Sequence, residues 1–237
     1  IPGKALQETD TERYARAVEA GAVGFINWNQ TVGRSAMVRA MHYNLPGEIP
    51  ASGLSFANGR FLMDLIEKGP VSVRMTEKHE MKKMKSWDVI AEIGGTSRAD
   101  EIVFFFAHHD GRDIGQGALN DGSGAAVVIE AARALAKHKG FYERTLKLGI
   151  TSCEVIGLLG SFAYVQSHKG EMDKIKLVLN LDASGRPGGS GLGLRINGRP
   201  ELVPYLESLA HEMRLPYKMA IEDGFGIQSD HLAFLLQ

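Results

Sequence analysis

The sequence predicts an α/β fold in which helices cover both faces of a central β-sheet, giving a three-layer sandwich. Strand-like and helix-like segments alternate over residues 85–237, as they do in sheets built from strand–helix units. Residues 102–107 (IVFFFA) are almost wholly apolar, as expected of a central strand that is buried on both faces. Residues 121–138 form a long helix whose beginning is marked by Asp121 and Ser123.

Apolar periodicity and the position of glycines set the limits of the other elements. The remaining predicted helices are 11–20, 56–68, 160–167 and 201–214, and the remaining predicted strands are 23–28, 71–75, 89–93, 146–151 and 176–181. The charged run 77–85 (EKHEMKKMK) carries no strong period. We therefore place a domain boundary there, between a small domain of residues 1–84 and a main domain of residues 85–237.

Composition excludes several classes of partner and site. The chain has 237 residues, with 27 basic and 28 acidic side chains and a formal net charge of -1. This balance gives no electrostatic reason to expect a nucleic acid or an anionic membrane as partner. No apolar run approaches the roughly 20 residues that span a bilayer. The single cysteine, Cys153, rules out both an internal disulfide and a zinc cluster built from cysteines.

Polar side chains gather where predicted strands end. Three groups follow strands directly and a fourth lies near the end of the chain: His108-His109-Asp110, Ser152-Cys153-Glu154, Asp182 and Ser229-Asp230-His231. Functional groups in open α/β sheets collect at the carboxyl ends of the strands, so we expect these groups to converge. Imidazole and carboxylate are ligands that zinc favours. In the His-x-Asp pattern, Asp110 can hold the second ring nitrogen of His108 and fix its orientation.

Each of these residues alone has an ordinary structural interpretation. A single His-x-Asp at a strand end is more often a surface pair, and Asp182, Asp230 or His231 alone can cap a turn. Only the combination of the four groups, in this order along the chain, predicts a metal site.

The same segments carry a resemblance to a known family. Four motifs occur in order: AHHDGRDIGQGALNDGSGAAVVIEAARAL (107–135), CEVIGLLGS (153–161), LNLDASGR (179–186) and SDHLAF (229–234). Together they resemble the signature of the M28 zinc aminopeptidases, which implies a mixed, mostly parallel sheet of the zinc exopeptidase type. Residues 1–84, with GAVGFINWN and EIPASGLSFANGRFL, are similar to the latter part of a protease-associated (PA) domain.

The resemblance implies a two-zinc site and a role for each matching residue. His108 and Asp182 would bind one zinc ion, and His231 with a glutamate would bind the other. An aspartate would bridge the two ions, Glu154 would act as general base, and Asp110 would steady His108. Zinc in such a site acidifies a bridging water and polarises the scissile carbonyl.

Two ligand positions depart from the family pattern. Aligned on Gly122-Ser123-Gly124, Asn120 stands where the bridging aspartate is expected. Aligned on Gly157-Leu158, Val155 stands where the ligand glutamate is expected, while Glu154 keeps the position of the base. A valine offers no ligand atom, and an amide lacks the charge of a carboxylate. A one-residue shift would instead make Asp121 the bridge and Glu154 the ligand, with Cys153 at the base position.

Three functions follow from this pattern. The first is a metallopeptidase that hydrolyses residues from the ends of peptides or small aminoacyl substrates, with one zinc ion favoured over two. Its metal ligands would be His108, Asn120, Asp182 and His231, and its catalytic residues Glu154 and Asp110. The second is an inactive pseudopeptidase kept as a binding module. A single-zinc cyclase is disfavoured, because two of its three expected ligands are altered here.

The chain ends carry two further expectations. The sequence begins at Ile1 without an initiator methionine and stops at Gln237 after an apolar run, so we expect it to be part of a longer chain. A sheet that lacks the family's later strand would leave an open edge where further residues or a second copy of the chain can pair. The association of PA domains with exported enzymes slightly favours an extracellular location.

Overall fold

The computed structural model describes residues 10–34, 36, 47–78, 80, 82–112, 115–184, 193–197, 199–214, 220–223 and 229–237. The chain divides into two compact units, residues 1–84 and 85–237. Gly185 and Arg186, the last two residues of the third motif, lie outside the described residues. Among the described residues, no helix has both the length and the apolar character needed to cross a bilayer.

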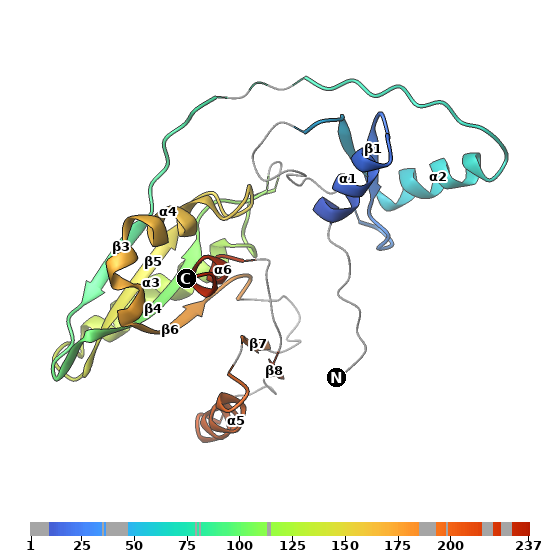
Figure 1. The fold of residues 1–237 in the computed structure, drawn as a ribbon. Helices are drawn as coiled ribbons and strands as arrows, with labels where there is room; N and C mark the ends of the chain where they lie inside the picture. The colour runs from blue at the N-terminus through green and yellow to red at the C-terminus, as the bar shows by residue number, and fades with distance from the viewer. Residues whose placement is uncertain are drawn as a thin grey trace. The chain divides into compact units, whose positions relative to one another are not determined.

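The first unit combines two short parallel strands with two helices (Figure 1). Its elements are α1 (Asp10–Glu19), β1 (Phe25–Trp28), β2 (Ala51–Leu54) and α2 (Phe56–Ile66). The buried hydroxyl of Tyr14 donates to Ile49 O at 2.9 Å and accepts from Ile49 N at 3.0 Å, which ties α1 to the segment before β2. Ser55 caps α2 by accepting a hydrogen bond from Asn58 N.

One predicted strand of this unit is wrong and another was missed. Residues 71–75 form no strand, and the Val73 side chain is 55% exposed. Alternating side chains make a strand only where a neighbour completes the hydrogen bonds, and no described strand lies beside this segment. Conversely, β2 (ASGL) contains a glycine and too few apolar residues to be recognised. The likeness of this unit to a PA domain stays a prediction.

The second unit is built on a mixed four-stranded sheet in the order β3-β5-β4-β6. Its strands are β3 (Val89–Ile93), β4 (Arg98–His108), β5 (Arg144–Thr151) and β6 (Ile175–Asn180). β3 is antiparallel to β5, whereas β4 is parallel to both β5 and β6. The predicted mixed, mostly parallel sheet is therefore confirmed.

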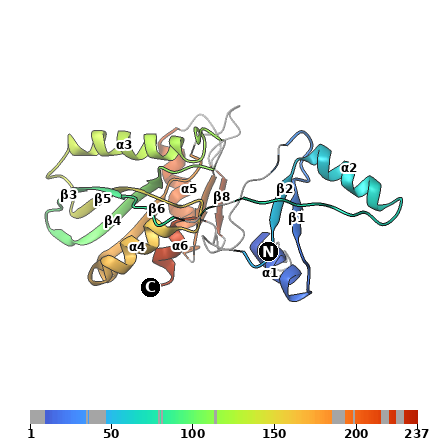
Figure 2. The same cartoon turned by 90° about the horizontal axis from the view of Figure 1, so that it is seen from above.

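Helices cover both faces of this sheet, as Figure 2 shows. The covering helices are α3 (Gly122–Ala136) on one face, and α4 (Leu159–Ser167) and α6 (His231–Leu235) on the other. On the α4 side, Phe104 and Phe106 of β4 pack with Tyr164 and Phe234. On the α3 side, Ala107 packs with Val128. Alternate residues of β4 thus enter opposite cores, which explains why the whole strand is apolar.

The remaining elements of this unit lie on either side of β6 in the sequence. They comprise a short 3₁₀ helix, η1 (Lys169–Lys174), which precedes β6, and then β7 (Gly193–Ile196), α5 (Leu202–Glu212) and β8 (Ala220–Asp223). β7 and β8 pair in parallel as a separate two-stranded sheet. Neither strand was predicted, because four residues carry too little pattern. The predicted polar group Ser229-Asp230-His231 lies where the short helix α6 begins, at His231.

Candidate metal centre

The site is organised around His108, the last residue of β4, whose ring is 1% exposed. Its Nδ1 lies 2.9 Å from the backbone oxygen of Asp110 and 3.3 Å from Asp110 Oδ1. A proton on Nδ1 satisfies this contact, so neutral His108 presents Nε2 as the free ring nitrogen. Nε2 is buried and has no hydrogen-bond partner among the described residues.

Two carboxylates face this buried nitrogen. Glu154 Oε2 lies 3.6 Å from His108 Nε2, and Asp182 Oδ1 lies 3.9 Å from it. Among the described residues, ligand atoms of His108, Asp121 and Asp182 also lie within 4.8 Å of one another. A buried, unpartnered imidazole nitrogen surrounded by carboxylate oxygens fits a divalent zinc ion, because zinc takes nitrogen and oxygen ligands together. The donor set therefore fits one metal ion.

The charges of the site shift the pKa values of its central pair. Burial alone lowers the pKa of His108, but its hydrogen bond to Asp110 and the nearby charges of Glu154, Asp121 and Asp110 raise it to about 9. Burial raises the pKa of Glu154 to about 7, the His108 charge opposes this shift, and the charges of Asp182 and Asp230 add to it. Glu154 therefore titrates near neutral pH, as a general base does.

Asp121 and Asn120 have different surroundings. The Asp121 carboxylate is 1% exposed and accepts three backbone N–H bonds, from Gly124 and Ala183 at 3.0 Å and from His108 at 3.1 Å. It thus caps α3 and joins the ends of β4 and β6. Asn120 Nδ2 instead donates to Asp182 Oδ1 at 2.8 Å. Asn120 therefore lies at the Asp182 side of the site, whereas Asp121 has both oxygens on backbone groups.

The loop that carries Glu154 is tied to the His108 side by Asp110. The Asp110 oxygens accept the N–H groups of Glu154 and Val155, each at 3.0 Å. One carboxylate thus contacts the histidine ring and the backbone of the loop opposite it. These hydrogen bonds and the His108 ring lower the pKa of Asp110 against the opposing effect of its burial. The neighbouring His109 takes no part, since its Nε2 contacts Trp87 O at 3.1 Å.

His231 is linked to Asp182 through other side chains and lies outside the cluster of His108, Asp121 and Asp182. Its Nδ1 is 3.3 Å from Asn180 Nδ2, and the same amide donates to Ser229 Oγ at 2.5 Å. Ser229 Oγ in turn donates to Asp182 Oδ2 at 2.9 Å. Sequence reasoning assigned no role to Asn180 or Ser229, although both lie within the quoted motifs. Their hydrogen bonds connect His231 to Asp182.

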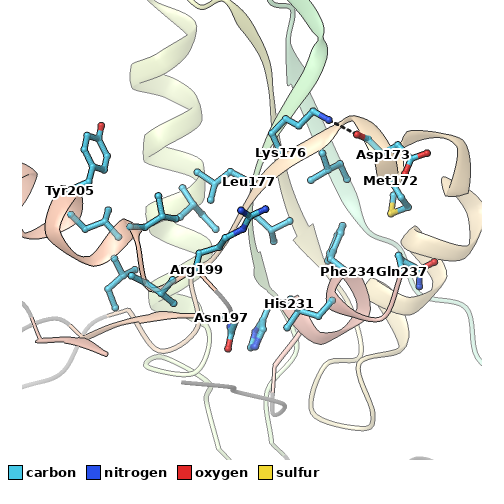
Figure 3. A pocket seen from close by; sticks show the side chains of 18 residues that line it. Met172, Asp173, Lys176, Leu177, Asn197, Arg199, Tyr205, His231, Phe234 and Gln237 are labelled. Carbon is cyan, nitrogen blue, oxygen red and sulfur yellow. Dashed lines mark hydrogen bonds between the residues drawn. The ribbon is translucent and has the colours of Figure 1, made fainter. Parts of the chain in front are cut away.

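Two cavities border the His231 side. One, of about 430 Å³, runs along β6 between η1, β7, α5 and α6, and Figure 3 shows His231, Phe234, Leu177 and Arg199 among the side chains that line it. The other, of about 390 Å³, is lined by Asp182, Ser229 and His231 together with apolar Val178 and Leu194. The second cavity therefore opens directly beside a carboxylate of the candidate centre.

Comparison with known proteins places these motifs in a family. Residues 88–237 match the family model described as Peptidase family M28. The chain belongs to this family. Leucine aminopeptidase 2 of Arthroderma otae is 30% identical over 235 residues, which is 94% of this chain and 46% of the relative. Carboxypeptidase Q of Mus musculus is 38% identical over 99 residues, 41% of this chain and 21% of the relative.

Two solved structures share the fold. The zinc aminopeptidase BSAP of Bacillus subtilis superposes with a TM-score of 0.70 at 23% identity, over 98% of this chain and 56% of that chain. A peptidase M28 precursor from Shewanella amazonensis gives a TM-score of 0.67 at 25% identity, over 93% of this chain and 50% of that chain. The chain spans about half the length of the curated leucine aminopeptidases it matches.

Proposed function

We propose that this M28 chain forms the catalytic part of an exopeptidase that hydrolyses residues from the ends of peptides with one zinc ion. The observation that carries the proposal is the buried Nε2 of His108, which faces Glu154 and Asp182 at 3.6 and 3.9 Å. Family membership and the names of the relatives support peptide hydrolysis.

One ion fits the residues better than two. His108 and Asp182 supply an imidazole and a carboxylate to the first ion, with the amide oxygen of Asn120 as a neutral third donor once its side chain turns. A second ion would be left with His231 alone, because the Val155 side chain has no donor atom. One protein ligand is too few for a zinc site.

The chain's own residues then divide the work of hydrolysis. A bound zinc ion would supply an acidified water and polarise the scissile carbonyl. Asp110 holds the His108 ring so that Nε2 faces the ion's position. Glu154, whose pKa is about 7, would take the proton of the attacking water and return it to the leaving amine. Because only ionised Glu154 can accept a proton, activity should rise with pH towards neutrality.

The cavity beside Asp182 is the place where we expect the substrate's side chain to lie. Val178 and Leu194 give it apolar walls, and Asn197 adds a polar group. A leucyl residue is therefore a suitable first substrate, in agreement with the names of the fungal relatives.

The test is hydrolysis of leucine p-nitroanilide and of a leucine-initiated tripeptide by zinc-loaded protein, with Glu154→Gln as the matched variant. We expect the wild type to release leucine from both and the variant to lose about 10²- to 10⁴-fold in kcat while keeping its zinc. Equal rates for wild type and variant would contradict the role of Glu154. Zinc-loaded wild type without activity on any peptide panel would point to a pseudopeptidase.

A further inference from the structure

The segment that presents Glu154 has an unusual backbone. Between β5 and α4, two non-glycine residues have left-handed conformations, Cys153 with φ 57° and Leu158 with φ 58°. Residues with side chains rarely adopt this region, and they stay there only when surrounding contacts enforce it. The position of Glu154 thus depends on whatever holds residues 151–161.

The ends of this loop are fastened to each other. Leu159 N donates to Cys153 O at 3.1 Å, and Gly160 N donates to Ser152 O at 2.9 Å. The approach at Gly160 is so close that a Cβ there would lie 2.4 Å from Ser152 O and 2.6 Å from Asp88 Oδ1. Asp110 holds the middle of the loop, as described above.

Asp88 holds the entry to the loop. It directly precedes β3, and its Oδ1 accepts two hydrogen bonds from Ser152, from the backbone N at 2.8 Å and from Oγ at 3.0 Å. Asp88 thus fixes the residue that lies two positions before Glu154.

Asp230 holds the two elements that border the loop, the end of β5 and the start of α4. It is 0% exposed, and its oxygens accept from Thr151 Oγ1 at 2.5 Å and from Ser161 Oγ at 2.6 Å. Thr151 is the last residue of β5 and Ser161 lies in the first turn of α4. One buried carboxylate at the start of α6 therefore joins the two elements between which the loop runs.

We propose that Asp88 and Asp230 are positioning residues that hold the Glu154 loop in its strained form, and so fix Glu154 opposite His108. Neither carboxylate is needed as a ligand or as a proton carrier in this role. The inference rests on the proposed function, because it assigns these residues to the placement of its general base.

The hydrogen-bond pattern predicts that asparagine can replace either aspartate. Asp88 uses only Oδ1 for Ser152, and an amide oxygen can accept the same two bonds. At Asp230, Thr151 Oγ1 also lies 3.0 Å from Ala107 O and Ser161 Oγ lies 3.1 Å from Leu158 O. Each hydroxyl therefore has a second acceptor and can turn to receive a hydrogen bond from an amide N–H. Alanine offers neither partner.

The experiment compares Asp88→Ala and Asp230→Ala with Asp88→Asn and Asp230→Asn in the whole chain, at a temperature where all are folded. We expect both alanine variants to lose at least about 10-fold in kcat with little change in KM, and both asparagine variants to stay within about 3-fold of wild type. Hydrogen exchange of the peptide covering residues 152–158 should accelerate in the alanine variants only.

Thr145→Val provides a control for stability alone. Thr145 is also a buried hydroxyl at a strand, and it donates to Ala99 O at the end of β5 remote from Glu154. It should lower Tm without changing kcat or the exchange of residues 152–158. Alanine variants that lose Tm yet keep wild-type kcat and loop exchange would overturn the proposal, as would asparagine variants as impaired as alanine.

Failure of the proposed function would give a different result. If the wild type binds no zinc and hydrolyses no peptide, the hydrogen exchange of residues 152–158 in the same five variants still measures how firmly Asp88 and Asp230 hold the loop. Rapid hydrogen exchange of the loop confined to the two alanine variants would support the positioning role of Asp88 and Asp230 in that case too. Unchanged exchange would reject this role.

Discussion

The two sides of the candidate centre differ in how completely they are built. On the His108 side, Asp110 fixes the ring, a buried nitrogen faces two carboxylates, and Glu154 has a pKa near 7. On the His231 side, the family resemblance predicts carboxylates where Asn120 and Val155 stand, and His231 Nδ1 lies 3.3 Å from Asn180 Nδ2. The difference between the two sides of the candidate centre lies in a few side chains.

This comparison shows that the hydrogen-bond frame around the predicted ligand positions is in place. Asp121 still caps α3 and bonds to the backbone at His108 and Ala183. Asn120 still reaches Asp182. The frame therefore allows each side to be tested by substitution without rebuilding the loop around it.

The largest expected effect separates the two histidines. His108→Ala removes the buried imidazole that faces both carboxylates, and zinc affinity should fall by at least about 100-fold. His231→Ala removes a residue outside the cluster of ligand atoms, and zinc affinity should change by less than about 10-fold. Competition with a chromophoric chelator measures both. Equal losses in the two variants would show that the sides are not different.

Placing carboxylates at positions 120 and 155 should remove the difference. Asn120→Asp combined with Val155→Glu gives the His231 side a bridging carboxylate and a second ligand. We expect a second zinc ion per chain and a rise of about 10-fold in kcat. Asn120→Leu with Val155→Leu is the matched control, without added charge, and should take up no second ion. A double variant that still holds a single ion would mean that the frame itself has changed.

The pH dependence of zinc binding sharpens the account of the His108 side. His108 has a pKa of about 9 without metal, so at neutral pH it must release a proton before Nε2 can bind zinc. Apparent zinc affinity should therefore rise by up to about 10-fold per pH unit between pH 7 and 9. Isothermal titration in buffers of different ionisation enthalpy counts the released proton. Asp110→Asn should flatten the dependence, because it removes a group that raises the pKa of His108.

The smallest effect concerns the stability of the metal-free protein. The folded-state pKa of His108 is raised from 6.5 to about 9, so its stabilising contribution is complete below pH 6.5 and is lost as pH rises through 9. The pKa of Glu154 is raised from 4.5 to about 7, so folding becomes less favourable as pH rises through that window as well. We expect Tm to fall by about 5–10 °C between pH 5 and 9.

Glu154→Gln isolates one part of that change. It should abolish the portion of the fall between pH 5 and 7 and reduce the portion above pH 7, because it also removes a charge that raises the pKa of His108. A metal-free protein that becomes steadily more stable from pH 5 to 9 would contradict both shifts.

Sequence patterns revealed those features that follow from strand ends and from long apolar runs. The strands β4, β5 and β6 were recognisable, and residues directly after parallel strands meet at one edge of a sheet. This predicted that His108, Glu154 and Asp182 lie close together, as they do in the structure. The four-residue strands β7 and β8 lacked sufficient pattern, and residues 71–75 had alternation without a partner strand. Alternation of apolar and polar side chains favours a strand, but a strand forms only beside another strand that completes its hydrogen bonds.

The positioning residues could not be read from the sequence for a different reason. Asp88 and Ser152 are 64 positions apart, and Asp230 and Thr151 are 79 apart. No local pattern links partners at such separations. The sequence likewise leaves open whether Asn120 or Asp121 is a ligand, because adjacent residues can exchange roles through a one-residue shift.

The zinc content of the wild-type chain tests the central claim most directly. Elemental analysis of protein purified without added metal, and again after zinc loading and desalting, gives the number of ions per chain. A site built on the His108 side alone predicts one zinc ion in the loaded protein. Two ions would contradict the difference between the sides, and none after soaking in millimolar zinc would contradict the metal centre itself.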